Sequence, residues 1–166
     1  EIETKHNAQM EANHDWLLGE SPWSLFGKTI LVYDEFRPFD LELTLNAGVG
    51  YKFISNDVWN LTGRFGSGAM RQWDGPDDNW RPEAMLGIDF EYIISCRQKL
   101  YGKSEYFPEW GDFAVFRVRT DAGWELVLDD ATNMSLKLGI IDRYDRNSGD
   151  TKPNTLDYSL LLLWKL

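Results

Sequence analysis

The chain alternates between apolar and polar residues over much of its length, and residues 41–53 (LELTLNAGVGYKF) do so without interruption. The odd-numbered positions of this segment are apolar, and the even-numbered positions carry polar residues or glycine. Successive side chains of a β-strand point to opposite faces of the sheet, so a period of two predicts a strand with one apolar face. We find no convincing stretch with the 3.6-residue spacing of a helix. The pattern therefore predicts an all-β fold.

Other segments share this alternation and together predict about nine strands. The clearest are residues 83–94, 116–128, 134–140 and 157–166. Weaker patterns predict strands near residues 23–34, 58–71 and 99–107, of which the first is apolar on both faces. An opening segment, 5–18, has only a thin apolar face.

The connections between these segments alternate between short and long. Short ones such as GESP and ISND are followed by long ones rich in Asp, Gly and Pro, such as RQWDGPDDNWRP and RNSGDTKPN. All eight connections follow this rule, with the long loops opposite the chain's C-terminal end. Such asymmetry is typical of membrane barrels, which have short periplasmic turns and longer extracellular loops. We therefore predict one domain over 1–166: an antiparallel up-and-down meander forming a transmembrane β-barrel, or part of a larger one.

Alternation alone leaves the orientation of the apolar faces open, because they point inward in a soluble barrel and outward in a membrane barrel. Three observations favour the outward orientation. Residues 41–53 span about 40 Å at about 3.3 Å per residue, which is long for a small soluble domain. The polar positions are rich in glycine, which suits a crowded interior. Many aromatic residues, among them Trp23, Tyr33, Tyr51 and Trp73, fall near predicted strand ends, as in interfacial belts.

With the apolar faces outward, apolar residues of the strands face lipid and charged residues face the lumen. The predicted lipid-facing residues are Leu43, Leu45, Val49, Leu86, Ile88, Val118, Leu126, Leu138, Leu160 and Leu162. The candidate lumen charge network comprises Glu42, Lys52, Arg64, Asp89, Glu91, Glu105, Arg117, Arg119, Asp121, Glu125, Lys137 and Arg143. These charges either pair as a structural network that fills the barrel or line a path for a solute, and we favour the network.

Composition excludes several classes of function and structure. A net charge of -10 and the lack of a basic patch argue against nucleic-acid binding. A single cysteine, Cys96, excludes an intrachain disulfide framework and a cysteine-based zinc site. The longest apolar run, residues 160–164, is far shorter than the ~20 residues of a membrane helix. The chain begins at Glu1 without a leader, which we interpret as a mature or trimmed product.

Signals for catalysis or metal binding are weak. His6 and His14 are the only histidines, and about 26 Å would separate them along one strand at 3.3 Å per residue. Residues 145–150 (DRNSGD) resemble a calcium loop, but Leu156 stands where the loop needs glutamate. The acidic loop 74–78 (DGPDD) leaves divalent-ion or glycan contacts conceivable. We therefore expect no catalytic residues, no metal site and no cofactor.

Several motifs together resemble a known family: YDEF (33–36), SEYFP (104–108), RVRTDAG (117–123), LKLGIIDRYD (136–145) and NTLDYSLLLLWKL (154–166). In this order they resemble the domain of unknown function 481 family, described as salt-induced outer-membrane proteins, over nearly the whole chain. The resemblance implies an outer-membrane β-barrel of Gram-negative-type bacteria without established enzymatic activity or cofactor. It also implies further strands before residues 5–18.

The function expected from these observations is that of a bacterial outer-membrane barrel with a non-catalytic envelope or osmotic-stress role, a small pore being one version of it. Its expected partners are outer-membrane lipids and either missing N-terminal strands or a second chain that closes the barrel. The alternative is a soluble antiparallel barrel that binds a small apolar ligand inside. A barrel enzyme that acts on lipid is a third hypothesis.

Overall fold

The computed structural model describes residues 7–35, 40–74, 78–129, 134–146 and 153–164. Its elements are β1 (Asn7–Leu17), β2 (Trp23–Asp34), β3 (Leu41–Ser55), β4 (Trp59–Trp73), β5 (Arg81–Ser95), β6 (Gln98–Pro108), β7 (Phe116–Asp129), β8 (Met134–Asp145) and β9 (Asn154–Trp164). Each strand pairs antiparallel with the next one in the chain. The predicted all-β meander is confirmed, including the weakly patterned first two strands. No helix in the described residues is long and apolar enough to cross a membrane.

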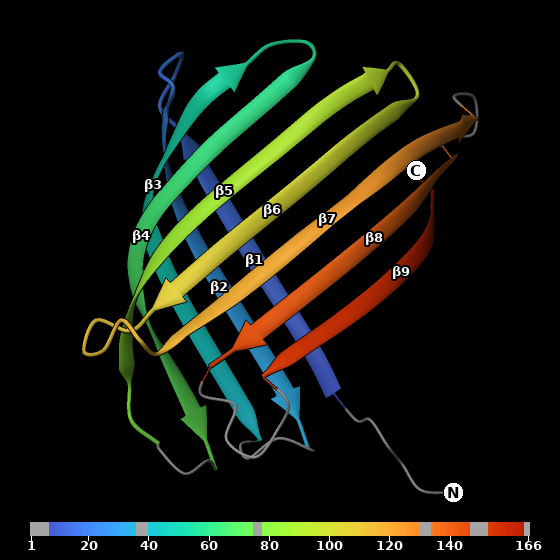
Figure 1. Cartoon of the computed structure of the whole chain (residues 1–166). Coiled ribbons are helices and arrows are strands. Elements are labelled where there is room, and N and C mark those ends of the chain that lie inside the picture. Colours follow the sequence, from blue (N-terminus) through green and yellow to red (C-terminus); the bar gives the residue numbers. More distant parts are fainter. Residues whose placement is uncertain (1–6, 36–39, 75–77, 130–133, 147–152, 165–166) are drawn as a thin grey trace, which may run out of the picture.

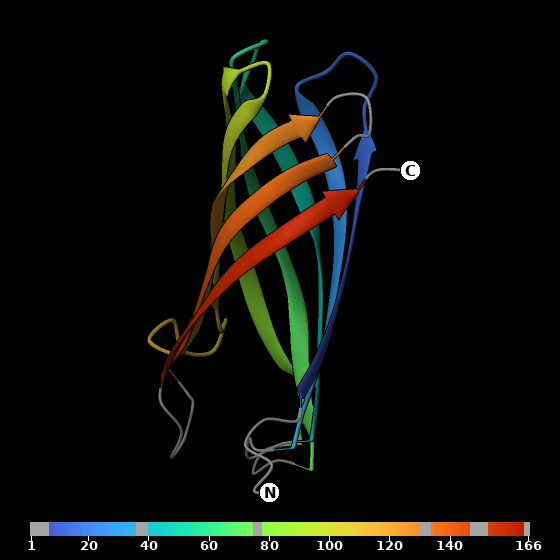
Figure 2. The same cartoon turned by 90° about the vertical axis from the view of Figure 1, so that its right-hand side faces the viewer.

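The sheet curls into a half-barrel (Figures 1 and 2). In Figure 1 the wall formed by β6–β9 crosses in front of the wall that contains β1 and β2. The sheet order runs from β1 to β9, so these two strands are its edges as far as the chain is described. Eight antiparallel steps separate the edges, and β1 and β9 therefore run in the same direction.

The two ends of the half-barrel differ, as the connections predict. The turns 18–22, 56–58 and 96–97 join strands at one end, which we call the short-turn end, and β7 leads to β8 at the same end. The connections 35–40, 74–80, 109–115 and 146–153 join strands at the other, the long-loop end. In Figure 1 β9 ends at the short-turn end and β1 begins at the long-loop end.

Side-chain burial alternates along the strands, and it is the polar side chains that are buried and the apolar ones that are exposed. This is the reverse of the arrangement in a water-soluble protein. On β3 the polar residues Glu42, Thr44 and Asn46 are 5%, 0% and 4% exposed, whereas Leu45 and Val49 are 42% and 38% exposed. The exposure pattern along β3 alternates accordingly. The polar positions thus face the interior of the curl, and the apolar positions form its outer surface.

Glycines on the inward face make room for buried aromatic rings. Gly48 and Gly66 face each other in the β3–β4 register, and the ring of Phe26 lies over both. A Cβ at Gly48 would lie 2.9 Å from that ring and 2.2 Å from the carbonyl oxygen of Phe65. Phe26 packs with Met85 and Phe107 into a small buried apolar cluster. The inward glycines are therefore a packing requirement of the curled sheet.

Candidate functional site

The inward face carries ion pairs at three levels along the half-barrel. The long-loop group consists of Glu42, Gln72, Arg81, Glu83, Glu109 and Arg117. The central group consists of Glu11, Lys28, Lys103, Glu105 and Arg119. The short-turn group consists of Asp15, Arg64, Asp89, Glu91, Lys99 and Glu125. These three groups together form the candidate site, which we call the lumen network.

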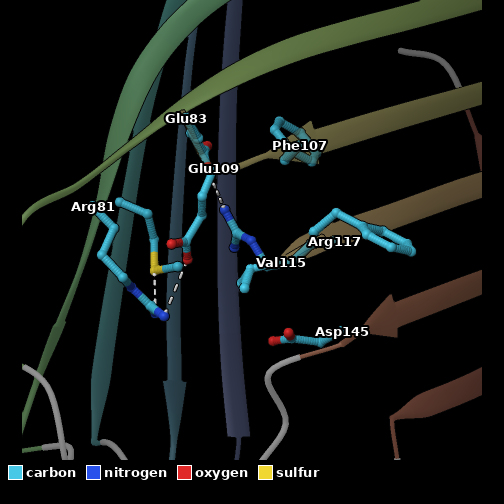
Figure 3. A pocket seen from close by; sticks show the side chains of 9 residues that line it. Arg81, Glu83, Phe107, Glu109, Val115, Arg117 and Asp145 are labelled. Atoms are coloured by element: carbon cyan, nitrogen blue, oxygen red, sulfur yellow. Dashed lines mark hydrogen bonds and ion pairs between the residues drawn. The ribbon is translucent and has the colours of Figure 1, made fainter. Parts of the chain in front are cut away.

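Arg117 is the centre of the long-loop group. Its two terminal nitrogens donate to Glu42 and Glu83, each at 2.7 Å, and both carboxylates are almost fully buried. Gln72 donates to Glu42 at 2.8 Å and accepts a hydrogen bond of 2.9 Å from Arg81. The group links strands β3, β4, β5 and β7, and Figure 3 shows several of its side chains around a cavity. That cavity measures about 10 Å³, roughly the room that one water needs.

Arg81 extends the same group toward the loop that follows β6. Its guanidinium pairs with Glu109 at 3.3 Å, as the dashed line in Figure 3 indicates. Glu109 and Glu83 form an isolated antiparallel bridge, so the chain after β6 continues along β5. These contacts therefore tie the start of the 109–115 connection to β5 at the long-loop end.

Glu11 is the centre of the central group. Its carboxylate lies 3.1 Å from the amine of Lys28, 3.5 Å from that of Lys103 and 2.7 Å from the guanidinium of Arg119. Lys28 also pairs with Glu105, and both are almost fully buried. Since β1 is a neighbour of neither β6 nor β7 in the sheet, the contacts of Glu11 with these strands cross the interior.

The short-turn group has the same cross-strand character. Arg64 of β4 pairs with Asp89 of the neighbouring β5 at 2.9 Å and with Asp15 of β1 at 3.2 Å. Lys99 lies 3.4 Å from Glu91 and 3.5 Å from Glu125. The Lys99–Glu91 pair is more exposed than any pair of the central group, so it contributes less to stability.

Eleven of the twelve predicted lumen charges are buried or half-buried at inward positions. Ten of them make ion pairs or ring contacts within the three groups or close to them. Among the latter, Arg143 pairs with Asp157, and the amine of Lys137 lies 4.3 Å from the ring centroid of Tyr101. Asp121 faces Lys103 in the β6–β7 register. Lys52 differs, because it is exposed at the short-turn end next to a register shift.

The ten residues predicted to face lipid all occupy outer-face positions. Leu43, Val118 and Leu126 are half-buried, and Leu160 and Leu162 on the edge strand β9 are the most exposed. Leu43, Ile88 and Leu126 therefore do not meet in a shared dry centre, which is the arrangement that a soluble apolar core would require.

Sequence reasoning missed several members of the lumen network. Glu83 shares the parity of Asp89 and Glu91 on β5, a signal that was available in the alternation. Lys28 lies in the segment 23–34, which is apolar on both faces and so gives no clear inward face. The signal that could have identified it is the charge itself, because a charged side chain in such a strand needs a buried partner. Glu11 was overlooked because its strand has little apolar patterning.

The described residues include no group of three or more His, Cys, Asp or Glu side chains that could hold a metal ion. His14 contacts the ring of Trp16 at a centroid distance of 4.5 Å. His6, most of the 145–150 motif and the centre of the 74–78 loop lie outside the described residues. The site is thus an arrangement of paired charges, which can hold strands together.

Comparison with known proteins places the chain in a family. The model of a family described as protein of unknown function, DUF481, matches residues 1–165 and so covers every strand of the half-barrel. The curated proteins contain no match to the chain.

Proposed function

The chain belongs to the DUF481 family, and from this premise we propose that it is a bacterial outer-membrane β-barrel protein with a non-catalytic role in the envelope, such as the response to osmotic stress. The observation that carries the proposal is the inverted burial of the sheet: Glu42, Thr44 and Asn46 are buried, whereas Leu45 and Val49 between and beyond them are exposed. Hydrocarbon around the outer face and polar surroundings inside would satisfy both sets.

The outer surface supports this proposal by its extent. Leu25, Leu45, Val49, Phe65, Leu86, Ile88 and Leu138, which come from five strands, are between 38% and 53% exposed. Soluble monomers rarely expose contiguous apolar patches of more than a few hundred Å². Lipid is the partner that such a continuous belt fits.

The height of the belt also suits a membrane. On β2, Trp23 lies at the short-turn end beside Tyr51, and Tyr33 lies at the long-loop end in the row that includes Trp73. Tyr33 lies ten positions after Trp23, about 33 Å along the strand at about 3.3 Å per residue. A tilt of about 40° reduces this to roughly 25 Å along the barrel axis, the height of the apolar band in outer-membrane barrels.

The interior favours a filled barrel over an open pore or a ligand cage. Buried carboxylates and cations from both walls are paired across the lumen, as in Arg117 with Glu42 and Glu83. Such a lining does not suit a small apolar ligand, because the bound ligand would remove polar contacts from the charged side chains at a cost in free energy. We therefore place the soluble ligand-binding barrel second.

Closure of the barrel is part of the proposal. Open sheet edges do not occur in lipid hydrocarbon, because their unpaired N–H and C=O groups would each cost several kcal/mol. The edges β1 and β9 run in the same direction, so an odd number of additional strands would pair antiparallel with both. Further strands or a second chain, as expected from the sequence, would supply them.

Membrane fractionation tests the proposal. The full chain, exported to the bacterial envelope, should remain with outer membranes after urea or carbonate washes and dissolve only with detergent. Circular dichroism of the solubilised protein should be of the β type. A chain that is monomeric and stable in plain buffer would overturn the proposal in favour of the soluble barrel.

A further inference from the structure

Among the described strands, Arg71 of β4 is the one lysine or arginine on the outer face of the sheet. It faces Leu43 across the β3–β4 register and lies two residues before the end of the strand, at the long-loop end. The other lysines and arginines of the described strands occupy inward positions, where several pair with buried carboxylates. A cation on the lipid side is tolerated best near the interface, where its cost falls. The position of Arg71 therefore calls for a reason other than lumen pairing.

Arg71 lies between two tryptophans. Its guanidinium carbon is 5.1 Å from the ring centroid of Trp73 and 6.0 Å from that of Trp80, and the two rings are in edge-to-face contact at 6.4 Å. Its Nε donates to Asp78 at 3.1 Å. An arginine has five N–H donors, and within the described residues this bond leaves the terminal nitrogens of Arg71 for another anion. The side chain is part-exposed, and Asp78 and Trp80 are exposed.

A second arginine–aromatic cluster lies at the same end of the half-barrel. The guanidinium carbon of Arg146 is 5.8 Å from the ring centroid of Phe116, and Phe116 stacks on Tyr144 at 5.6 Å. Tyr106 completes this row at 5.3 Å from Phe116. Arg146 is exposed and follows directly after β8. Both clusters combine a cation that is at least part-exposed with rings that face outward at the long-loop end.

We propose that the Arg71–Trp73–Trp80 cluster, with the Arg146 cluster as a second position, binds the phosphate groups of anionic lipids in the leaflet that adjoins the long-loop end. Amphipathic rings lie at headgroup level in a membrane, which sets the clusters at the height of lipid phosphates. A guanidinium binds phosphate through paired, charge-assisted hydrogen bonds. This inference rests on the proposed membrane location.

Asp78 allows the inference to be tested, because its carboxylate competes with a phosphate for the guanidinium of Arg71. If Arg71 serves lipid phosphate, removing the charge of Asp78 should strengthen lipid binding. If Arg71 only fixes the 74–80 connection through Asp78, loss of either partner should have the same effect. The two substitutions Arg71→Gln and Asp78→Asn therefore separate the two roles.

The experiment uses the full chain in non-ionic detergent micelles, with bound lipid counted by native mass spectrometry. The probes are a bisphosphorylated lipid A and the same lipid with its phosphates removed. We expect wild-type protein to retain the phosphorylated probe and Arg71→Gln to lower its affinity about tenfold, the effect of about one charge-assisted hydrogen bond. Asp78→Asn should raise the affinity, and Arg146→Gln should lower it by less than Arg71→Gln does.

The matched control is Arg97→Gln, which removes an exposed arginine from the turn between β5 and β6 at the short-turn end. It should leave lipid retention unchanged. Equal retention by wild type and Arg71→Gln, equal retention of both probes, or weaker binding by Asp78→Asn would each overturn the inference. If the protein needs detergent but gives one of these results, only the lipid-binding inference is overturned. If the protein is stable in plain buffer, the proposed membrane function is overturned as well.

Discussion

Glu11 of β1 and Arg119 of β7 form an ion pair of 2.7 Å although five strands lie between theirs in the sheet. A flat sheet would hold these strands far apart, since neighbouring strands are spaced about 4.8 Å. The contact exists only because the sheet curls until one wall faces the other. The same carboxylate also contacts Lys28 and Lys103. Glu11 therefore joins an edge strand to the opposite wall.

Replacing Glu11 with glutamine should destabilise the protein by about 3 kcal/mol, because removal of one partner leaves largely buried cations uncompensated. Urea unfolding in detergent micelles, followed by tryptophan fluorescence, measures the change. The control is Glu20→Gln in the exposed turn between β1 and β2, which should stay within about 0.5 kcal/mol of wild type. Equal midpoints for the two variants would show that Glu11 does not hold the curl.

Arginine at Val49 should lower the free energy of unfolding by about 2–4 kcal/mol in lipid vesicles, since Val49 lies midway along the outer face of β3. The matched control is Thr62→Arg, because Thr62 is half-buried at an inward position and faces Asp89 in the β4–β5 register. That arginine gains a carboxylate neighbour and should cost less. Similar losses at both positions would contradict the lipid-facing assignment of the apolar face.

The strands and their facing could be predicted because a period of two is a local property of the sequence. The contacts of the lumen network could not, because they depend on how far the sheet curls. Thr44 illustrates the difference: alternation places it inward, but only the structure shows that it is fully buried and 3.4 Å from Arg117. An arginine there would meet a like charge in a filled space, so Thr62 is the better inward control.

Substitution of Gly48 by alanine should cost about 1–3 kcal/mol, in the range for overpacking a close-packed interior. The new Cβ would lie 2.2 Å from the carbonyl oxygen of Phe65 and 2.5 Å from the Cα of Gly66, and a backbone cannot yield as a flexible side chain does. Gly111→Ala is the control, because nothing lies within 4 Å of its added Cβ. Thermal unfolding in micelles distinguishes the two, and an unchanged midpoint for Gly48→Ala would contradict the packing role assigned to this glycine.

Planar-bilayer recordings should give little current for the wild-type protein, because ion pairs from both walls cross its interior. Arg117→Ala should raise the conductance and favour cations, since Glu42 and Glu83 lose the guanidinium between them. Arg146→Ala is the control on the outer face and should leave conductance unchanged. A large steady wild-type current would favour a pore over the filled barrel.

The orientation of the chain in the membrane can be tested with its own single cysteine. Cys96 is exposed in the two-residue turn between β5 and β6, at the short-turn end. Short turns of outer-membrane barrels face the periplasm, so a membrane-impermeant maleimide should leave Cys96 unlabelled in intact cells and label it after the outer membrane is permeabilised.

The complementary variant moves the thiol to the other end. In a Cys96→Ser background, Asp112→Cys places it in the exposed 109–115 connection at the long-loop end, where intact cells should be labelled directly. Labelling of Cys96 but not of Asp112→Cys in intact cells would mean that the chain inserts the other way up. The Arg71 cluster would then meet the inner leaflet, so the labelling result also decides which lipids its guanidinium can reach.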